Sequence, residues 1–191
     1  VVYVGSENGT VYAFDADTGR LRWTYRASGA VKGGLAYDAG KLYVGDYGGN
    51  VQAIDARTGR KVWSVSCGAR AFGLGGGRSY ATPPVAFGRV YVGNTNGSMY
   101  SFSTSDGRLA WRRATGNYIY SSAAVESVPG AGPTVYVGSY DGKVYALNAD
   151  AATDGLQFSL DSASAATFAL PASRATLSVD RLIPGAHHVV D

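Results

Sequence analysis

Apolar and polar residues alternate in short runs along most of the first 158 residues of this chain. A period of two predicts β-strands that bury one face. The runs are separated by segments containing dipeptides typical of tight type I′ hairpin turns, namely Asn8-Gly9, Gly48-Gly49, Asn96-Gly97 and Asp141-Gly142. No stretch requires a helix, so the pattern predicts an all-β fold.

One motif occurs four times, as Val2-Tyr3-Val4-Gly5, Leu42-Tyr43-Val44-Gly45, Val90-Tyr91-Val92-Gly93 and Val135-Tyr136-Val137-Gly138. Each copy is followed by a turn, a second strand, a polar Gly turn and a large aromatic residue. That residue is Trp23, Trp63 or Trp111, each 18 positions after the motif Gly, and Phe158 in the fourth copy, 20 positions after it. An apolar segment also precedes copies two to four. Four short antiparallel strands in roughly 40 to 50 residues match a β-propeller blade.

The repeats place blades near residues 1–26, 30–66, 80–114 and 120–160. The first unit lacks its upstream strand, so we expect the chain to start inside a blade. Residues 159–191 do not repeat and are rich in Ala and Ser, with one strand pattern at 175–179. This tail could supply a closing strand, begin another domain or be poorly ordered, and the sequence does not choose among these.

The regularly spaced Trp residues suggest how the blades associate. A blade is apolar on both faces and must stack on a neighbour, and a large flat ring at a constant offset suits that packing. A ligand-stacking role is the alternative, and we favour packing.

The repeat as a whole resembles the pyrroloquinoline-quinone (PQQ) repeat of quinoprotein alcohol dehydrogenase-like propellers, over residues 2–158. In that family Thr-Gly-x-x-x-Trp is a docking motif whose Trp stacks on an adjacent blade. The resemblance implies docking roles for Thr18, Gly19, Trp23, Thr58, Gly59, Trp63, Gly107 and Trp111, and more weakly for Gly155 and Phe158. It also implies seven or eight blades, so we favour a fragment of a larger ring over a closed four-bladed ring.

Composition narrows the class of protein. With 191 residues, 46% hydrophobic and 16% charged, the chain is large and apolar enough to fold around a substantial core. The net charge of +3 comes from scattered Lys and Arg, which argues against a nucleic-acid partner. No apolar stretch is long enough for a membrane helix. The resemblance implies a periplasmic or extracellular location, although no signal peptide is visible.

The residues expected of a quinoprotein dehydrogenase are not evident. The resemblance implies an adjacent Cys-Cys disulfide, a Ca²⁺ site and an Asp base, whereas Cys67 is the single cysteine. Asp15, Asp55, Asp106 and Asp141 fall in turns, where carboxylates usually cap backbone N–H groups. We therefore expect no catalytic residues, metal or cofactor, with PQQ and calcium as the alternative.

The two longest loops carry residue types that are enriched at protein interfaces. They hold Arg70, Phe72, Arg78 and Tyr80 in the first loop, and Asn117, Tyr118 and Tyr120 in the second. Packing near the central channel is an equal alternative for these side chains. Our first hypothesis is a non-enzymatic scaffold for protein–protein interaction, with possible partners including further copies that meet at open blade edges. A dehydrogenase fragment and a carbohydrate-binding propeller are the alternatives.

Overall fold

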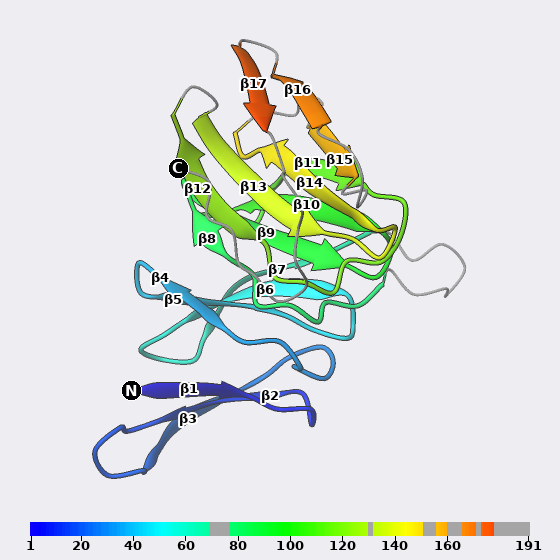
Figure 1. Ribbon diagram of the computed structural model, residues 1–191. Helices are drawn as coiled ribbons and strands as arrows, with labels where there is room; N and C mark the ends of the chain where they lie inside the picture. The colour runs from blue at the N-terminus through cyan, green and yellow to red at the C-terminus, as the bar shows by residue number, and fades with distance from the viewer. Residues whose placement is uncertain (69–76, 130–131, 151–155, 160–165, 171–172, 178–191) are drawn as a thin grey trace.

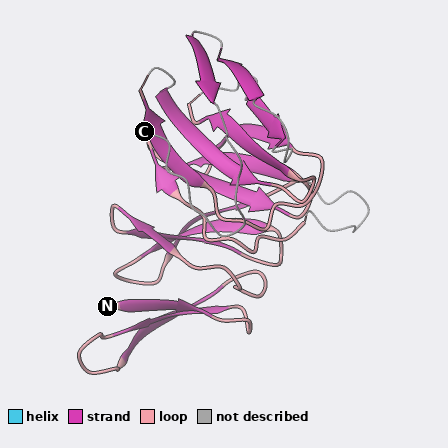
Figure 2. Cartoon of the chain, in the orientation of Figure 1, coloured by secondary structure: helices cyan, strands magenta, loops and turns pink. Residues whose placement is uncertain are grey.

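The computed structural model describes residues 1–68, 77–129, 132–150, 156–159, 166–170 and 173–177. Every regular element in these ranges is a β-strand, and none is a helix (Figure 2). The alternation of apolar and polar residues is therefore realised as strands, and the all-β prediction is confirmed. No described segment forms a long apolar helix of the kind that crosses a membrane.

The strands form a series of antiparallel sheets in chain order (Figure 1). The first sheet has three strands, β1 (Val2–Gly5), β2 (Thr10–Phe14) and β3 (Leu21–Arg26). The second has four, β4 (Ala36–Asp38), β5 (Lys41–Gly45), β6 (Asn50–Asp55) and β7 (Lys61–Ser66). The third has β8 (Val85–Ala86), β9 (Arg89–Asn94), β10 (Ser98–Ser103) and β11 (Leu109–Ala114). The fourth has β12 (Ala124–Val128), β13 (Gly132–Gly138), β14 (Lys143–Asn148) and β15 (Leu156–Ser159).

Within each sheet, neighbouring strands in the chain are neighbours in space, as a propeller blade requires. A bulge falls at the same place in three blades, between Ala13 and Phe14, Ala53 and Ile54, and Ser101 and Phe102. A bulge bends a strand and increases its twist. The repeat in the sequence thus produces the same local geometry in each blade.

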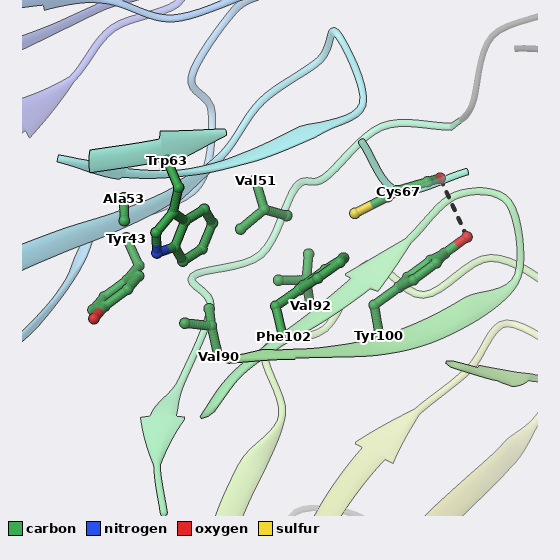
Figure 3. Close-up of a cluster of buried hydrophobic side chains, with 9 residues drawn as sticks. All are labelled: Tyr43, Val51, Ala53, Trp63, Cys67, Val90, Val92, Tyr100 and Phe102. Atoms are coloured by element: carbon green, nitrogen blue, oxygen red, sulfur yellow. Dashed lines mark hydrogen bonds between the residues drawn. The ribbon is translucent and has the colours of Figure 1, made fainter. Parts of the chain in front are cut away.

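Among the described residues the core forms three clusters, which lie between the first and second, second and third, and third and fourth sheets. Figure 3 shows the middle cluster, where Tyr43, Trp63 and Cys67 of the second sheet meet Val92 and Phe102 of the third. Because successive side chains on a strand point to opposite faces, Leu42 and Val44 pack toward the first sheet while Tyr43 packs toward the third. The second and third sheets are therefore buried on both faces.

Past the fourth sheet, β16 (Ala166–Leu170) and β17 (Ser173–Leu177) pair with each other in an antiparallel hairpin. The strand expected at 175–179 thus begins two residues earlier. In the described part of the chain, β17 has no strand partner other than β16.

Candidate functional site: a tyrosine-lined face

The strands have two ends, and the blades are joined differently at each. At one end lie the turns that follow β2, β6 and β10, together with the Trp residues. At the other lie the β1–β2, β5–β6, β9–β10 and β13–β14 turns and the linker segments that lead from one blade into the next.

At the first end, each Trp reaches across to the following blade. The indole N–H of Trp23 donates to the carbonyl oxygen of Ala56 at 3.1 Å, that of Trp63 to Thr104 at 3.2 Å, and that of Trp111 to Ala149 at 3.0 Å. Trp63 and Trp111 are almost fully buried. The indole therefore supplies both buried apolar area and a satisfied polar group.

The Tyr of the repeated motif shares this role, which the sequence reasoning did not anticipate. Tyr3, Tyr43 and Tyr91 donate their hydroxyl protons to the same three carbonyls, at 3.0, 3.5 and 3.4 Å. Each Tyr ring lies 5.7 to 5.9 Å from the Trp ring of its own blade. The recurrence of Tyr at the second position of all four motif copies was the available signal.

The glycine of the Thr-Gly motif lies directly under the preceding blade's indole. At Gly59, which has φ of +72°, a Cβ would come within 2.7 Å of the Trp23 ring, and at Gly107, with φ of +74°, within 2.8 Å of the Trp63 ring. A positive φ and a ring in contact both favour glycine. Gly19 has the same positive φ but no atom near its absent Cβ.

The threonines of that motif act within their own turn. Thr58 donates from its hydroxyl and its backbone N–H to the carboxylate of Asp55, at 2.6 and 2.7 Å, and Thr18 bonds Asp15 in the same way. Gly155 lies outside the described residues. The backbone of Phe158 pairs with Val144 in β14, and its side chain is outside the described part.

At the opposite end, each linker is held by backbone hydrogen bonds to the turns of two blades. In the first linker Val31 N–H donates to Ser6, and Tyr47 N–H donates back to Ala30. The second linker has the same two bonds, from Ser79 N–H to Asp46 and from Thr95 N–H to Arg78. The third linker has them from Ile119 N–H to Asn94 and from Tyr140 N–H to Tyr118. The three linkers therefore present equivalent positions on a fixed frame.

The motif glycine allows each linker to approach closely. A Cβ on Gly5, Gly45 or Gly93 would overlap the side chain of Val31, Ser79 or Ile119, respectively. Because that linker residue points inward, the residues on either side of it are available to the surface. These flanking positions are Ala30 and Lys32, Arg78 and Tyr80, and Tyr118 and Tyr120.

Two carboxylates strengthen this frame. Asp46 is fully buried and accepts hydrogen bonds from Ser28 N–H, Asn50 N–H and the amide of Gln52. Asp141 accepts from Gly116 N–H at 2.7 Å and Tyr145 hydroxyl at 2.6 Å. Burial opposes ionisation of Asp141, but these hydrogen bonds hold its pKa below the ordinary value. Both carboxylates are committed to anchoring the chain.

Five tyrosines from three blades lie together on this face, and we call them the tyrosine row: Tyr47, Tyr80, Tyr118, Tyr120 and Tyr140. Ring centroids are 4.5 Å apart for Tyr47 and Tyr80, 4.5 Å for Tyr80 and Tyr120, and 4.9 Å for Tyr120 and Tyr140. Successive rings in this sequence meet at 54° to 65°. Tyr118 adds an edge contact to Tyr120 at 6.0 Å.

One end of the row carries positive charge. The Lys32 ammonium lies 4.9 Å, and the Arg78 guanidinium 5.4 Å, from the centroid of the Tyr47 ring. Cations over the face of an aromatic ring are attracted by its quadrupole. Glu7 lies 3.3 Å from Lys32.

Burial, followed by the neighbouring tyrosines, raises the pKa of Tyr120, so its hydroxyl stays protonated at neutral pH.

Two adjoining hollows open beside the row. The first, of about 320 Å³, is lined by Arg78, Tyr80, Thr95, Asn96, Tyr118 and Tyr120. The second, of about 310 Å³, shares Thr95, Asn96 and Tyr118 with the first and extends to Thr115 and Asn117. Aromatic rings, hydroxyls and amides from the described residues line both hollows, and the Arg78 side chain adds a guanidinium to the first.

The structure brings together five of the seven residues that the sequence suggested as an interaction surface: Arg78, Tyr80, Asn117, Tyr118 and Tyr120. Arg70 and Phe72 lie outside the described residues. Tyr47, Tyr140 and Lys32 were missed. Tyr47 and Tyr140 both stand two positions after the motif Gly, so comparing the turns of the four copies could have found them.

A cavity of about 640 Å³ lies elsewhere, in a groove lined by Val65, Tyr100, Phe102, Leu109 and Arg112. At the preceding junction Tyr25 stands in place of Val65, and its hydroxyl donates to Gln52 at 2.6 Å. The groove is thus where a smaller residue leaves space between two blades.

Among the described residues, no three His, Cys, Asp or Glu side chains come close enough together to hold a metal ion. Cys67 is a free thiol, and burial raises its pKa to about 12. A buried neutral thiol is a packing group rather than a reactive one.

The fold has clear relatives among solved structures. The chain is similar to BamB from Moraxella catarrhalis, with 23% identity and a TM-score of 0.63, over 78% of this chain and 43% of that one. It is also similar to the quinohemoprotein alcohol dehydrogenase ADHIIG from Pseudomonas putida HK5, with 23% identity and a TM-score of 0.66, over 82% and 32% of the two chains. The corresponding enzyme from Comamonas testosteroni gives 20% identity and a TM-score of 0.70, over 82% and 33%.

These likenesses establish the propeller fold, and the chain spans less than half the length of each of these proteins. No curated protein sequence matches it significantly. The family described as outer membrane protein assembly factor BamB matches residues 1–117. That match covers more than half of the chain and confirms the PQQ-like repeat, so the protein belongs to this BamB family of propellers.

Proposed function

We propose that the protein is a non-enzymatic scaffold that binds a protein partner through the tyrosine row. The observation that carries this proposal is the contact of five tyrosine rings on linkers and hairpin turns that are held together by backbone hydrogen bonds. Tyr residues give large contact area with a polar tip and lose little side-chain entropy on binding, which is why interfaces are rich in them.

The family supports a protein partner and a location outside the cytoplasm. The matching family is described as an outer membrane assembly factor, and one similar solved structure is a BamB. We therefore propose a periplasmic or cell-surface location for the protein. Its functional face would then be a binding surface, supported by blades whose interiors are dedicated to packing.

A photo-crosslinking amino acid tests the scaffold. Tyr140 is 68% exposed within the row, and Tyr37, at the opposite end of the strands, is 63% exposed and serves as the matched control. In cells that make the full-length protein, a crosslinker at 140 is expected to trap a discrete protein partner, and one at 37 is not. Equal products from both positions would argue against the proposal.

A dehydrogenase fragment is the second candidate, favoured by the similarity to two quinohemoprotein alcohol dehydrogenases. It would require cofactor-binding residues outside those described. The test is to add PQQ and Ca²⁺ to the full-length protein. Quinone absorbance retained after gel filtration, together with dye-linked alcohol oxidation, would favour the enzyme over the scaffold.

Self-association is a further possibility that the first sheet supports. Val2, Val4 and Leu21 are 44% to 55% exposed, whereas Leu42 and Val44, at equivalent positions in the second sheet, are buried against the neighbouring blade. Exposed apolar sheet faces favour association. Sedimentation of the 191-residue chain should show concentration-dependent oligomers, and a monomer at all concentrations would refute this.

A further inference from the structure

We infer that the tyrosine row recognises an extended, proline-containing peptide segment with an acidic residue at the end that meets Lys32 and Arg78. This inference rests on the proposed scaffold function and names the chemistry of its partner. It draws on the shape of the row, its hydrogen-bonding groups, its charge and its rigidity.

The row is corrugated rather than flat. Successive rings meet at 54° to 65°, so no two neighbouring rings in this series are coplanar. Proline-rich peptides form polyproline II helices that seat their rings against grooves lined by aromatic side chains. The hollow lined by Tyr80, Tyr118 and Tyr120 supplies an aromatic groove of this kind.

The polar groups suit a backbone without internal hydrogen bonds. A polyproline II segment leaves its carbonyl oxygens unpaired and needs donors from its partner. The exposed side chains of Tyr118 and Tyr140 can bring hydroxyl donors to such carbonyls. The hollow lined by Tyr80 and Tyr118 is also lined by Thr95 and Asn96, and its volume of about 320 Å³ can take a ring-sized group.

Charge gives the segment a direction. Polyproline II helices look similar from either end, so a ring row alone would accept both orientations. Lys32 and Arg78 both lie over Tyr47, at one end of the row, and Glu7 is the ion-pair partner of Lys32 among the described residues. An acidic side chain next to the prolines would meet these cations, and the opposite orientation would not.

The row is also held in place before any ligand arrives. Tyr47 and Tyr140 are fixed by N–H bonds of 2.9 Å to Ala30 and Tyr118, and their turns are anchored by Asp46 and Asp141. A rigid surface and a stiff peptide both reduce the entropy lost on binding. This combination favours a short linear segment over a large folded partner surface.

The test is titration calorimetry of the purified chain with a synthetic eight-residue peptide that has alternating prolines and two terminal aspartates. We expect saturable binding, at least ten-fold weaker for the Tyr140→Ala variant and unchanged for Tyr37→Ala. A peptide with alanine in place of proline should bind at least ten-fold more weakly. Equal affinity of the proline and alanine peptides would overturn the inference, as would the absence of any binding at millimolar peptide.

Charge reversal distinguishes lost recognition from unfolding. Arg78→Glu should weaken binding of the aspartate peptide and strengthen binding of a peptide with lysines at the same positions. A variant that merely unfolds would lose binding of both peptides. A neutral oligosaccharide that binds with Tyr140-dependent affinity while the peptide does not would replace the inference with carbohydrate recognition. If the peptide fails but crosslinking at 140 persists, the inference falls and the scaffold stands. If crosslinking fails while the peptide binds, the scaffold proposal falls and peptide recognition by the row stands.

Discussion

The two ends of the strands are built from the same repeat but have diverged differently. At the Trp end, all three described junctions use the same groups, an indole N–H and a tyrosine hydroxyl that meet one backbone carbonyl. At the linker end, the backbone hydrogen bonds repeat but the side chains do not, because Lys32, Tyr80 and Tyr120 occupy equivalent positions.

Under the proposed function, this difference separates stability from recognition within a single chain. Groups that are identical at every junction satisfy a requirement that every junction shares, namely the packing of one sheet on the next. Linker side chains that differ although the backbone hydrogen bonds repeat are not needed for that packing. The tyrosine row is therefore available for the binding function that we propose, and substitutions at the two ends should affect different properties, stability at the Trp end and binding at the linker end.

The largest effect on stability is expected at the Trp end. Trp63→Ala removes a buried ring between the second and third sheets and should lower the free energy of unfolding by about 3–5 kcal/mol. Urea denaturation followed by circular dichroism measures this. Trp63→Phe keeps most of the ring packing but loses the N–H bond to Thr104, so a smaller loss of about 1–2 kcal/mol is expected. A loss below 1 kcal/mol for Ala would contradict the packing role.

A pair of glycines separates backbone strain from contact with the indole. Gly59 and Gly19 share a positive φ, but only Gly59 lies against a Trp ring. Gly19→Ala should cost about 1–2 kcal/mol from its left-handed conformation alone. Gly59→Ala should cost about 1–3 kcal/mol more, because the new Cβ displaces Trp23. Equal losses in urea denaturation would show that the indole contact adds nothing.

Acid should weaken the turns at the Trp end. Hydrogen bonds from the Thr58 hydroxyl and N–H lower the pKa of Asp55 below its ordinary value of 3.8. The unfolded chain therefore takes up this proton first, so the stabilising contribution is complete above pH 3.8 and is lost as pH falls through the folded-state pKa. Thermal melts between pH 6 and pH 2.5 should show a shallower acid decline for Asp55→Asn. Parallel curves for variant and parent would contradict this.

The smallest effect on stability is expected in the tyrosine row. Tyr140→Ala removes a side chain that is 68% exposed, and exposed substitutions usually change the free energy of unfolding by no more than about 0.5 kcal/mol. In urea denaturation, the change in the free energy of unfolding should be as small for Tyr140→Ala as for Tyr37→Ala. A loss similar to that of Trp63→Ala would mean that the row packs the blades rather than serving a ligand.

The fold could be predicted from the sequence because its signals are local and repeated. The alternation in β2, β6, β10 and β14, the turn dipeptides and the spacing from motif Gly to Trp each follow from the pleat of a strand. The roles of Tyr3, Tyr43 and Tyr91 were missed because their hydroxyls bond carbonyls 53 to 61 residues away. Such contacts depend on how one sheet sits on the next.

The candidate site was predictable in part. Arg78, Tyr80, Asn117, Tyr118 and Tyr120 were suggested from loop length and residue type, but nothing in the sequence showed that their rings touch. Tyr47 and Tyr140 come from hairpin turns 93 residues apart, and the linker hydrogen bonds bring both turns to the same face. Residue type alone could not distinguish a ligand surface from packing at the channel.

The sequence by itself determined that the chain forms short antiparallel strands joined by tight turns, because strand period and turn geometry are properties of a few adjacent residues. Only the tertiary structure decided which tyrosines meet. Linkers and turns from different blades share a face once the sheets are stacked, and stacking is governed by contacts between residues far apart along the chain.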